Sequence, residues 1–205
     1  MLLIGSCTIL KAQKDPKARQ LLDKASSLLQ GNGVEIKFTA TSTANGKNMG
    51  TTNGTILLKG NKFYLQTPSA KTWFDGKTQW SYLPQNEEVN VSNPTAEELQ
   101  HINPYALVQI YKNGYNYSMG RATSYKGKSV QQINLKAQNG SREMQTATLY
   151  LLKANSEPVC IKLTDKNHNS HNIEVTSLRK GINLNDRQFR FDSKKYPNAE
   201  VIDLR

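Results

Sequence analysis

The stretch from Gly54 to Leu83 constrains the fold of this chain more than any other part of the sequence. It holds short runs rich in apolar residues, each ended by turn residues, at positions 55–59, 62–66, 72–74 and 77–83. The pair Asp75-Gly76 predicts a hairpin turn of type I′, in which both central residues need a positive φ. Consecutive antiparallel strands are therefore expected here.

Side chains alternate between the two faces of a strand, so every second residue of these runs shares a face. We therefore predict one apolar wall made of Ile56, Leu58, Phe63, Leu65, Phe74, Trp80 and Tyr82. Something has to cover a wall of this size, and what covers it decides what the protein can bind.

The segment before this wall predicts an amphipathic helix. Asp15 is a good N-cap, and Pro16 suits the first helical position. Apolar residues follow at helical spacing until Gly31-Asn32-Gly33 ends the helix: Ala18, Leu21, Leu22, Ala25, Leu28 and Leu29.

Further strands are predicted on both sides of the wall. Residues 34–40 alternate between apolar and polar, and a return strand rich in Thr and Gly follows the turn at Asn45-Gly46. After the wall we expect extended segments at 89–91, 115–119, 130–137, 146–153, 159–165, 171–178 and 201–202.

Two short helices interrupt this series of strands. Asn93-Pro94 and Asn103-Pro104 each place a cap before a proline, which predicts helices at 95–100 and 105–112. The elements together predict a mainly β (α+β) fold: a strongly curved antiparallel sheet with an N-terminal helix and a short helical lid. Such a sheet is a natural container for an apolar ligand.

The charge of the chain is high but evenly spread. Lys and Arg number 27 against 16 Asp and Glu, which gives a formal net charge of +11. The lysines form no dense run, so we interpret them as a solvated basic surface and expect no nucleic-acid partner. No internal repeat or long linker divides residues 14–205, which we expect to form a single domain.

Residues 1–13 differ sharply from the rest of the chain and look like the apolar part of an export signal, cleaved near Ala12. Ile4-Gly5-Ser6-Cys7 also looks like a lipoprotein processing box, in which Cys7 would become lipidated. Export is expected in either case. Cys160 is expected to be buried in a strand without a disulfide partner.

The sequence does not argue for an enzyme. It has no GxSxG motif, no phosphate-binding glycine loop and no activated Cys/His pair. His168 and His171 are spaced HxxH, but only Asp165 lies near them as a further ligand. We interpret both histidines as turn residues and expect no catalytic residue, no metal and no cofactor.

Several segments together resemble the outer-membrane lipoprotein carrier (LolA-like) family, over essentially the whole chain after residue 13. They are Phe38-Thr39, residues 54–59, Lys62-Phe63, residues 73–77 and 80–82, Asn103-Pro104, Phe189-Arg190-Phe191, Tyr196-Pro197 and residues 200–203. Family members carry an arginine and a proline just after the lysine that Lys59 matches, and that arginine helps to hold the lid closed. Here Gly60-Asn61 take that place.

The resemblance implies an unclosed β-barrel with a helical lid over a hydrophobic cavity. It implies a monomeric carrier that binds the acyl chains of lipoproteins, or of other acylated lipids, and shuttles them through the periplasm from the inner to the outer membrane. The partners would be an inner-membrane lipoprotein-releasing transporter and an outer-membrane acceptor. The residues expected to line the cavity and lid are Leu21, Leu22, Leu28, Phe38, Ile56, Leu58, Phe63, Leu65, Phe74, Trp80, Tyr82, Tyr105 and Val108.

Other hypotheses stay open beside the carrier. One is an outer-membrane receptor of the same fold, anchored through Cys7. Another is an envelope regulatory module that senses lipid or protein, and a third is a secreted hydrolase. The mass of the mature N-terminus separates a carrier from an anchored receptor, and lipid that co-purifies with the protein favours a carrier.

Overall fold

The computed structural model describes residues 14–31, 33–95, 98–99 and 109–205. Its helical elements are α1 (Pro16–Leu29) and the 3-10 turns η2 (Ile110–Lys112), η3 (Asp186–Phe189) and η4 (Ser193–Lys195). Its strands are β1 (Val34–Ala44), β2 (Lys47–Lys59), β3 (Lys62–Gln66), β4 (Lys71–Phe74), β5 (Gln79–Leu83), β6 (Glu88–Ser92), β7 (Tyr115–Tyr125), β8 (Lys128–Ala137), β9 (Met144–Leu152), β10 (Pro158–Asp165), β11 (Ser170–Lys180) and β12 (Glu200–Asp203).

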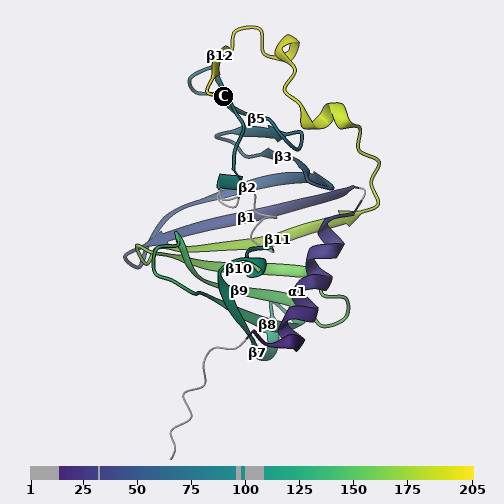
Figure 1. Ribbon diagram of the computed structural model, residues 1–205, viewed down its shortest axis with the longest axis vertical. Helices are drawn as coiled ribbons and strands as arrows, with labels where there is room; N and C mark the ends of the chain where they lie inside the picture. Colours follow the sequence, from purple (N-terminus) through teal and green to yellow (C-terminus); the bar gives the residue numbers. More distant parts are fainter. Residues whose placement is uncertain (1–13, 32, 96–97, 100–108) are drawn as a thin grey trace, which may run out of the picture.

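Within the described residues, all twelve strands belong to one sheet, in the order β12-β6-β5-β4-β3-β2-β1-β11-β10-β9-β8-β7. Neighbouring strands are antiparallel, except that β12 runs parallel to β6. The two edge strands, β12 and β7, lie at opposite ends of the molecule (Figure 1), so the sheet does not close into a barrel. The prediction of a mainly β fold built on one unclosed, mostly antiparallel sheet is confirmed.

Helix α1 begins at the predicted cap. The Asp15 carboxylate accepts hydrogen bonds from the backbone N–H groups of Ala18 (3.2 Å) and Lys17 (2.8 Å). These bonds lower the pKa of Asp15 below its usual value. Asp15 also joins the helix to β7, because its N–H donates to the carbonyl oxygen of Tyr117 (3.0 Å) and its carboxylate accepts from the N–H of Met119 (3.3 Å).

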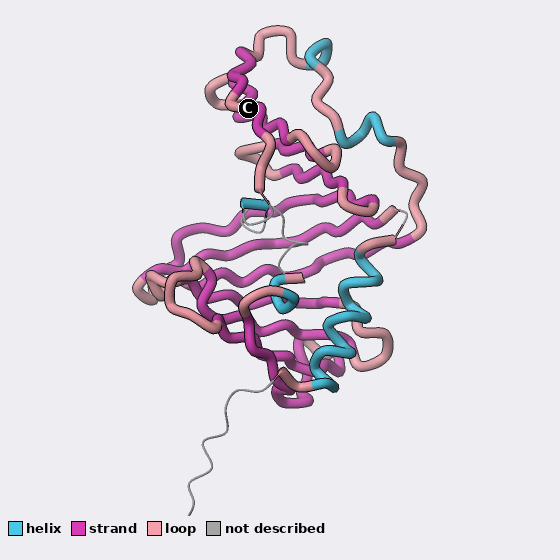
Figure 2. Tube along the Cα trace, in the orientation of Figure 1, coloured by secondary structure: helices cyan, strands magenta, loops and turns pink. Residues whose placement is uncertain are grey.

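The apolar stripe of α1 packs on one face of the sheet, which we call the inner face. That stripe consists of Ala18, Leu22, Ala25 and Leu29, all buried. Leu21 and Leu28 are only half-buried, and Leu21 packs against this core. Figure 2 shows α1 lying across one end of the sheet, where it reaches β7.

One hydrophobic core joins this helix to the inner face. Besides the helix residues it includes Val34, Ile36, Ile56, Leu58, Phe63, Phe74, Ile110, Tyr111, Tyr115, Tyr117, Ile133, Leu135, Ala147, Leu149, Leu151, Ile161 and Leu163. The core therefore spans both halves of the sheet, from β4 to β7.

The turn at Asp75-Gly76 differs from the prediction. Gly76 has a φ of 103°, but Asp75 does not adopt a positive φ. Phe74 pairs with Gln79, so residues 75–78 form a loop instead of a two-residue type I′ turn. The cause is the Asp75 carboxylate, which accepts hydrogen bonds from the backbone N–H of Lys77 (3.1 Å) and Thr78 (3.0 Å) and so stabilises a longer connection.

The predicted lid falls largely outside the described residues. Of the segments 95–100 and 105–112, the structure describes helical backbone at residues 98–99 and the 3-10 turn η2. Thr95 and Glu98 make the reciprocal bonds of a capping box, since the Glu98 carboxylate accepts from the Thr95 N–H (2.7 Å) and the Thr95 hydroxyl accepts from the Glu98 N–H (3.3 Å).

Candidate functional site

The inner face brings together much of the predicted apolar wall. Strand register places Ile56 opposite Leu65, and Leu58 opposite Phe63. Phe63 in turn lies opposite Phe74, and the centroids of these two rings are 5.4 Å apart. Phe63 is 1% exposed, so in this structure it is a packed core residue.

The margin of this wall is more accessible than its centre. Leu65 and Leu21, both predicted site residues, are partly buried hydrophobic residues packed against the core. The sequence did not indicate the other members of this margin, because single apolar residues far apart in the chain form it: Leu99, Met119, Ala137, Met144, Ile173, Val175 and Leu178.

Trp80 and Tyr82 were predicted on the wrong face. Trp80 pairs with Trp73, and Tyr82 pairs with Lys71, so both lie on the face opposite to Phe74. The loop of residues 75–78 contains an even number of residues, which places Gln79 and the residues in phase with it on the inner face instead. Neither aromatic residue belongs to the inner wall.

The remaining predicted site residues fall into separate groups. Leu22 is fully buried in the core, whereas Leu28 is half-buried. Tyr105 and Val108 lie outside the described residues.

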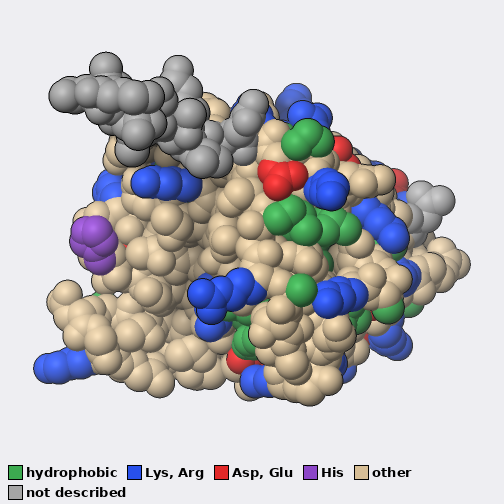
Figure 3. Space-filling model, turned by 90° about the horizontal axis from the view of Figure 1, so that it is seen from below, with side chains coloured by type: hydrophobic (Ala, Val, Ile, Leu, Met, Phe, Trp, Pro, Cys, Tyr) green, Lys and Arg blue, Asp and Glu red, His purple; other side chains and the backbone are tan. Residues whose placement is uncertain are grey.

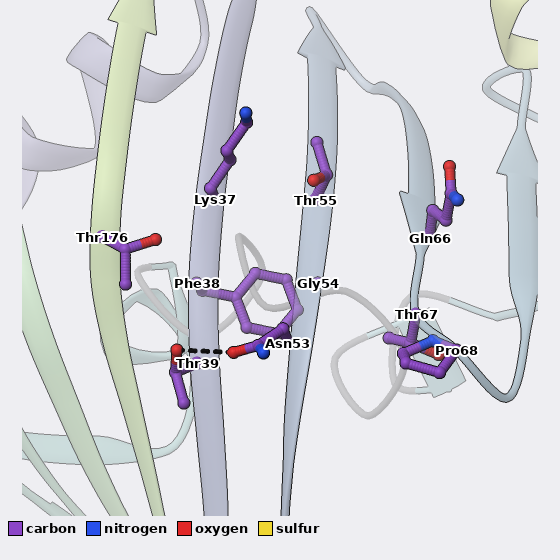
Figure 4. Close-up of a pocket in the computed structure, with 10 residues that line it drawn as sticks. All are labelled: Lys37, Phe38, Thr39, Asn53, Gly54, Thr55, Gln66, Thr67, Pro68 and Thr176. Atoms are coloured by element: carbon purple, nitrogen blue, oxygen red, sulfur yellow. Dashed lines mark hydrogen bonds between the residues drawn. The ribbon is translucent and has the colours of Figure 1, made fainter.

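Phe38 lies beside an open recess of about 500 Å³. Figure 4 shows its ring next to Gly54, where an added Cβ would come within 2.3 Å of the ring. The other residues lining the recess are largely polar: Lys37, Thr39, Asn53, Thr55, Gln66, Thr67, Pro68 and Thr176. The recess lies where the pairing of β2 with β3 ends at Thr55 and Gln66, and there the Thr39 hydroxyl donates to Asn53 (2.8 Å).

A buried tyrosine joins the turn η2 to helix α1, and no pattern in the sequence indicated this contact. Tyr111 in η2 is 1% exposed, and its hydroxyl donates a hydrogen bond to the Asp23 carboxylate of α1. Burial, followed by the contact with Asp23, raises the pKa of Tyr111 far above its usual value. Tyr111 therefore stays neutral and keeps η2 attached to α1.

Lys59 directly precedes Gly60-Asn61, the pair that takes the place of the arginine and proline of the family. Lys59 contacts the C-terminal segment. Its ammonium group donates to the Leu184 carbonyl oxygen (2.9 Å) and to the Asp186 carboxylate (2.8 Å), which also accepts from Lys62 (2.6 Å). These two lysines lower the pKa of Asp186 to about 2. Gly60 itself occupies the β2–β3 turn with a φ of 59°.

His168 lies in the turn between β10 and β11, as predicted, whereas His171 was wrongly predicted as a turn residue: it belongs to β11, where it pairs with Ser42 and Leu163. His168 adopts a φ of 63°, and Nδ1 of His171 lies 3.0 Å from the Ser42 hydroxyl. Nε2 of His171 is 3.8 Å from Asp165, whose carboxylate already accepts from the N–H groups of Asn167 and Asn169 (2.8 Å each). Within the described part of the chain, no group of three or more His, Cys, Asp or Glu could hold a metal ion.

Basic side chains are dispersed over the surface. Seen from below, Lys and Arg side chains are spread over this face of the molecule, and several of them lie beside hydrophobic side chains (Figure 3). Several basic residues pair with carboxylates, such as Arg179 with Glu35 (2.7 Å) and Lys180 with Glu157 (2.7 Å). Among the described residues, no helix is both long and apolar enough to span a membrane.

Solved structures share this architecture at low sequence identity. An uncharacterized conserved protein from Thermus thermophilus has a TM-score of 0.63 at 14% identity, covering 91% of this chain and 99% of its own. A DUF1329 family protein from Desulfovibrio piger has a TM-score of 0.53 at 11% identity, covering 87% and 98%. A LolA superfamily protein from Nitrosomonas europaea has a TM-score of 0.48 at 14% identity, covering 85% and 97%.

No curated protein matches the sequence of the chain. A family model does match it over residues 8–167, and that model describes the outer membrane lipoprotein carrier protein LolA. The match covers well over half of the chain and includes the helix, the inner wall and the strands β1 to β10. The chain therefore belongs to the outer membrane lipoprotein carrier protein (LolA) family.

Proposed function

We propose that the protein is a periplasmic carrier that binds the acyl chains of lipoproteins against the inner face of its sheet and shuttles them from the inner to the outer membrane. It would receive cargo from an inner-membrane lipoprotein-releasing transporter and deliver it to an outer-membrane acceptor. It would act as a monomer after removal of the export signal at residues 1–13. Binding and release need no covalent chemistry, so no catalytic residue is assigned.

The observation that carries this proposal is the continuous apolar inner face with a partly exposed margin. The core residues of this face extend from Phe74 in β4 to Tyr117 in β7. Partly buried residues such as Leu21, Leu65 and Ile173 extend the same apolar surface outward. An acyl chain needs such a surface because its own chemistry offers only dispersion contacts and release from water.

The energetics fit a carrier. Each buried CH₂ group contributes ~0.8 kcal/mol, so a chain of about sixteen carbons gains on the order of 10 kcal/mol by leaving water. A carrier in an aqueous space has to match part of that gain and still release its cargo. Residues at the margin can exchange contacts with a ligand at less cost than the packed centre around Phe63.

The test is binding of a fluorescent fatty-acyl probe by the full chain, with native mass spectrometry of the protein as purified. We expect co-purified lipid or lipopeptide in the parent. Leu65→Glu places a charge on the inner margin and should weaken probe binding by about tenfold or more, because burying an unpaired carboxylate beside an acyl chain is unfavourable.

Met49→Glu is the matched control. Met49 is 67% exposed, outside the inner wall, so the same introduced charge should leave probe binding unchanged. Equal binding by the parent and Leu65→Glu, or no binding of acyl probe by the parent, would contradict a carrier site on the inner face. The mass of the mature N-terminus, read in the same experiment, distinguishes cleavage near Ala12 from lipidation at Cys7.

A further inference from the structure

The C-terminal segment covers part of the opposite face of the sheet, which we call the outer face. After β11 the chain passes through η3 and η4 before it ends at β12 beside β6 (Figure 1). Turn η3 lies against β3 and β4, and Phe189 at its end is fully buried. Ion pairs hold the segment in place, among them Arg190 with Asp75 (3.1 Å).

Aromatic rings from the strands and from this segment meet on the outer face. The Trp73 ring lies 5.4 Å from Tyr64, 5.6 Å from Phe191 and 5.8 Å from Tyr196 between centroids. Tyr196 also lies 4.6 Å from Tyr82. Tyr82, which was predicted for the inner wall, therefore belongs to a second aromatic cluster on the other face.

A pocket of about 560 Å³ lies between the strands and the segment. It is lined by Leu57, Tyr64, Trp73, Arg187, Gln188, Arg190, Phe191, Asp192, Lys195 and Tyr196. Three of these residues are cationic and one is a carboxylate, so the pocket combines an aromatic interior with a net positive lining.

The cations of this pocket are not equally neutralised. Arg190 pairs with Asp75, and Lys195 lies 4.0 Å from Asp192. The guanidinium group of Arg187 has no carboxylate within salt-bridge distance among the described residues, and Arg187 is exposed. An exposed guanidinium beside aromatic rings can bind a carboxylate or phosphate while the rings contact an apolar group.

We propose that this outer pocket is a second binding site, which takes an anionic group attached to an aromatic ring. Two sources share that chemistry: a small aromatic acid, and an aromatic side chain flanked by Asp or Glu in a partner protein. A flat anionic membrane does not fit as well, because Trp73 is only 7% exposed and lies beneath the C-terminal segment. A bilayer surface could reach the cations but not this ring.

The experiment measures binding of three unlabelled peptides with the cores Asp-Phe-Glu, Asp-Ser-Glu and Lys-Phe-Lys to the full chain by isothermal titration calorimetry, with indole-3-propionate as a competitor. The Asp-Phe-Glu peptide should bind, and the other two should bind at least about tenfold more weakly. Competition by indole-3-propionate alone identifies a small aromatic acid as sufficient. Failure to compete, with the peptide still bound, identifies a peptide partner.

Two charge reversals locate the site. Arg187→Glu should weaken binding of the Asp-Phe-Glu peptide by about tenfold or more. Lys128→Glu changes the same charge at an exposed position of the β7–β8 hairpin and should leave it unchanged. Phe191→Leu keeps the apolar volume but removes a ring, and it should weaken binding of the Phe peptide without unfolding the chain.

The inference fails if Arg187→Glu and Lys128→Glu bind the peptide equally, or if the parent binds none of the aromatic acids. It also fails if anionic lipid vesicles bind the parent and displace the peptide while Phe191→Leu behaves like the parent. Binding of the fatty-acyl probe should be the same in Arg187→Glu and the parent. Loss of one site is thus distinguishable from loss of the other.

Discussion

Replacement of Phe63 by Ala tests whether the centre of the inner wall is packed core. Phe63 is 1% exposed and contacts the Phe74 ring at 5.4 Å between centroids. Loss of transfer free energy contributes about 2 kcal/mol. A void of ~90 Å³ adds about 2 kcal/mol at ~24 cal/mol per Å³, so the expected loss in the free energy of unfolding is about 4 kcal/mol.

For a chain of this size, about 4 kcal/mol corresponds to a fall of about 8–16 °C in the melting temperature. The assay is thermal and urea unfolding of the parent, Phe63→Ala and the control Phe63→Leu. The control keeps most of the buried apolar volume and should lose less than about 1.5 kcal/mol.

A loss below about 1 kcal/mol in Phe63→Ala would refute this reasoning. That result is expected only if the ring borders empty space, so that truncation leaves few contacts to lose. An intermediate loss accompanied by a changed urea slope would instead indicate that the variant is no longer a two-state folder, and calorimetry would then replace the extrapolation.

The described contacts support three further predictions. Lowering the pH should loosen the attachment of α1 and of the C-terminal segment, because the pKa values of Asp15 and Asp186 are lower in the folded chain than their reference value of 3.8. The stability that these carboxylates contribute is therefore complete above pH 3.8. It is lost as the pH falls toward about 2, the pKa of Asp186 in the folded chain. Acid unfolding followed by circular dichroism should show that Asp15→Asn changes the loss of stability between pH 3.8 and about 2. An acid-unfolding curve identical to that of the parent would contradict the role of the carboxylate. Gly33→Ala should lose more than about 1 kcal/mol in urea unfolding, because Gly33 has a φ of 157° and an added Cβ would lie 1.8 Å from the Ile182 carbonyl oxygen. Asp75→Ala should lose about 1–3 kcal/mol, since its carboxylate accepts two backbone N–H bonds and the Arg190 pair, and Asp75→Asn should retain part of that stability.

The sequence predicted well those elements whose ends are set by capping or turn residues close to them in the chain. Asp15 and Pro16 fix the start of α1, because a cap and a proline act within one turn of the chain. Strand β3 was predicted with its observed bounds, Lys62–Gln66, because turn residues flank an alternating run. The strands after residue 115 were likewise located from their alternation, although β7 extends farther than predicted, to Tyr125.

Tertiary contacts decided which faces of β3 to β5 are covered, and the alternation of residues along the strands could not show this. A repeated aromatic pattern normally indicates the buried face of a strand, but the C-terminal segment covers the outer face of β3 to β5, so both faces carry aromatic residues. Tyr82 and Trp73 pack against Tyr196, which lies more than a hundred residues later in the chain. No local signal can reveal such a partner. The wrong face predicted for Trp80 and Tyr82 has a local cause: a turn with an even number of residues places Phe74 opposite an odd-numbered residue, so Trp80 and Tyr82 lie on the other face.

The register of one hairpin illustrates the same division. The sequence alone determined that a turn occurs at Asp75-Gly76, because these residues favour turns through their own backbone and side chain. The side-chain bonds of Asp75, its pair with Arg190 and the pairing of Phe74 with Gln79 settled how many residues the loop contains. A two-residue turn and the observed four-residue loop both contain an even number of residues, so both put Trp80 and Tyr82 on the face opposite to Phe74. What only the folded chain decides is which residues pair across the hairpin: Phe74 pairs with Gln79 and not with Lys77, because the contacts of Asp75 stabilise the longer loop.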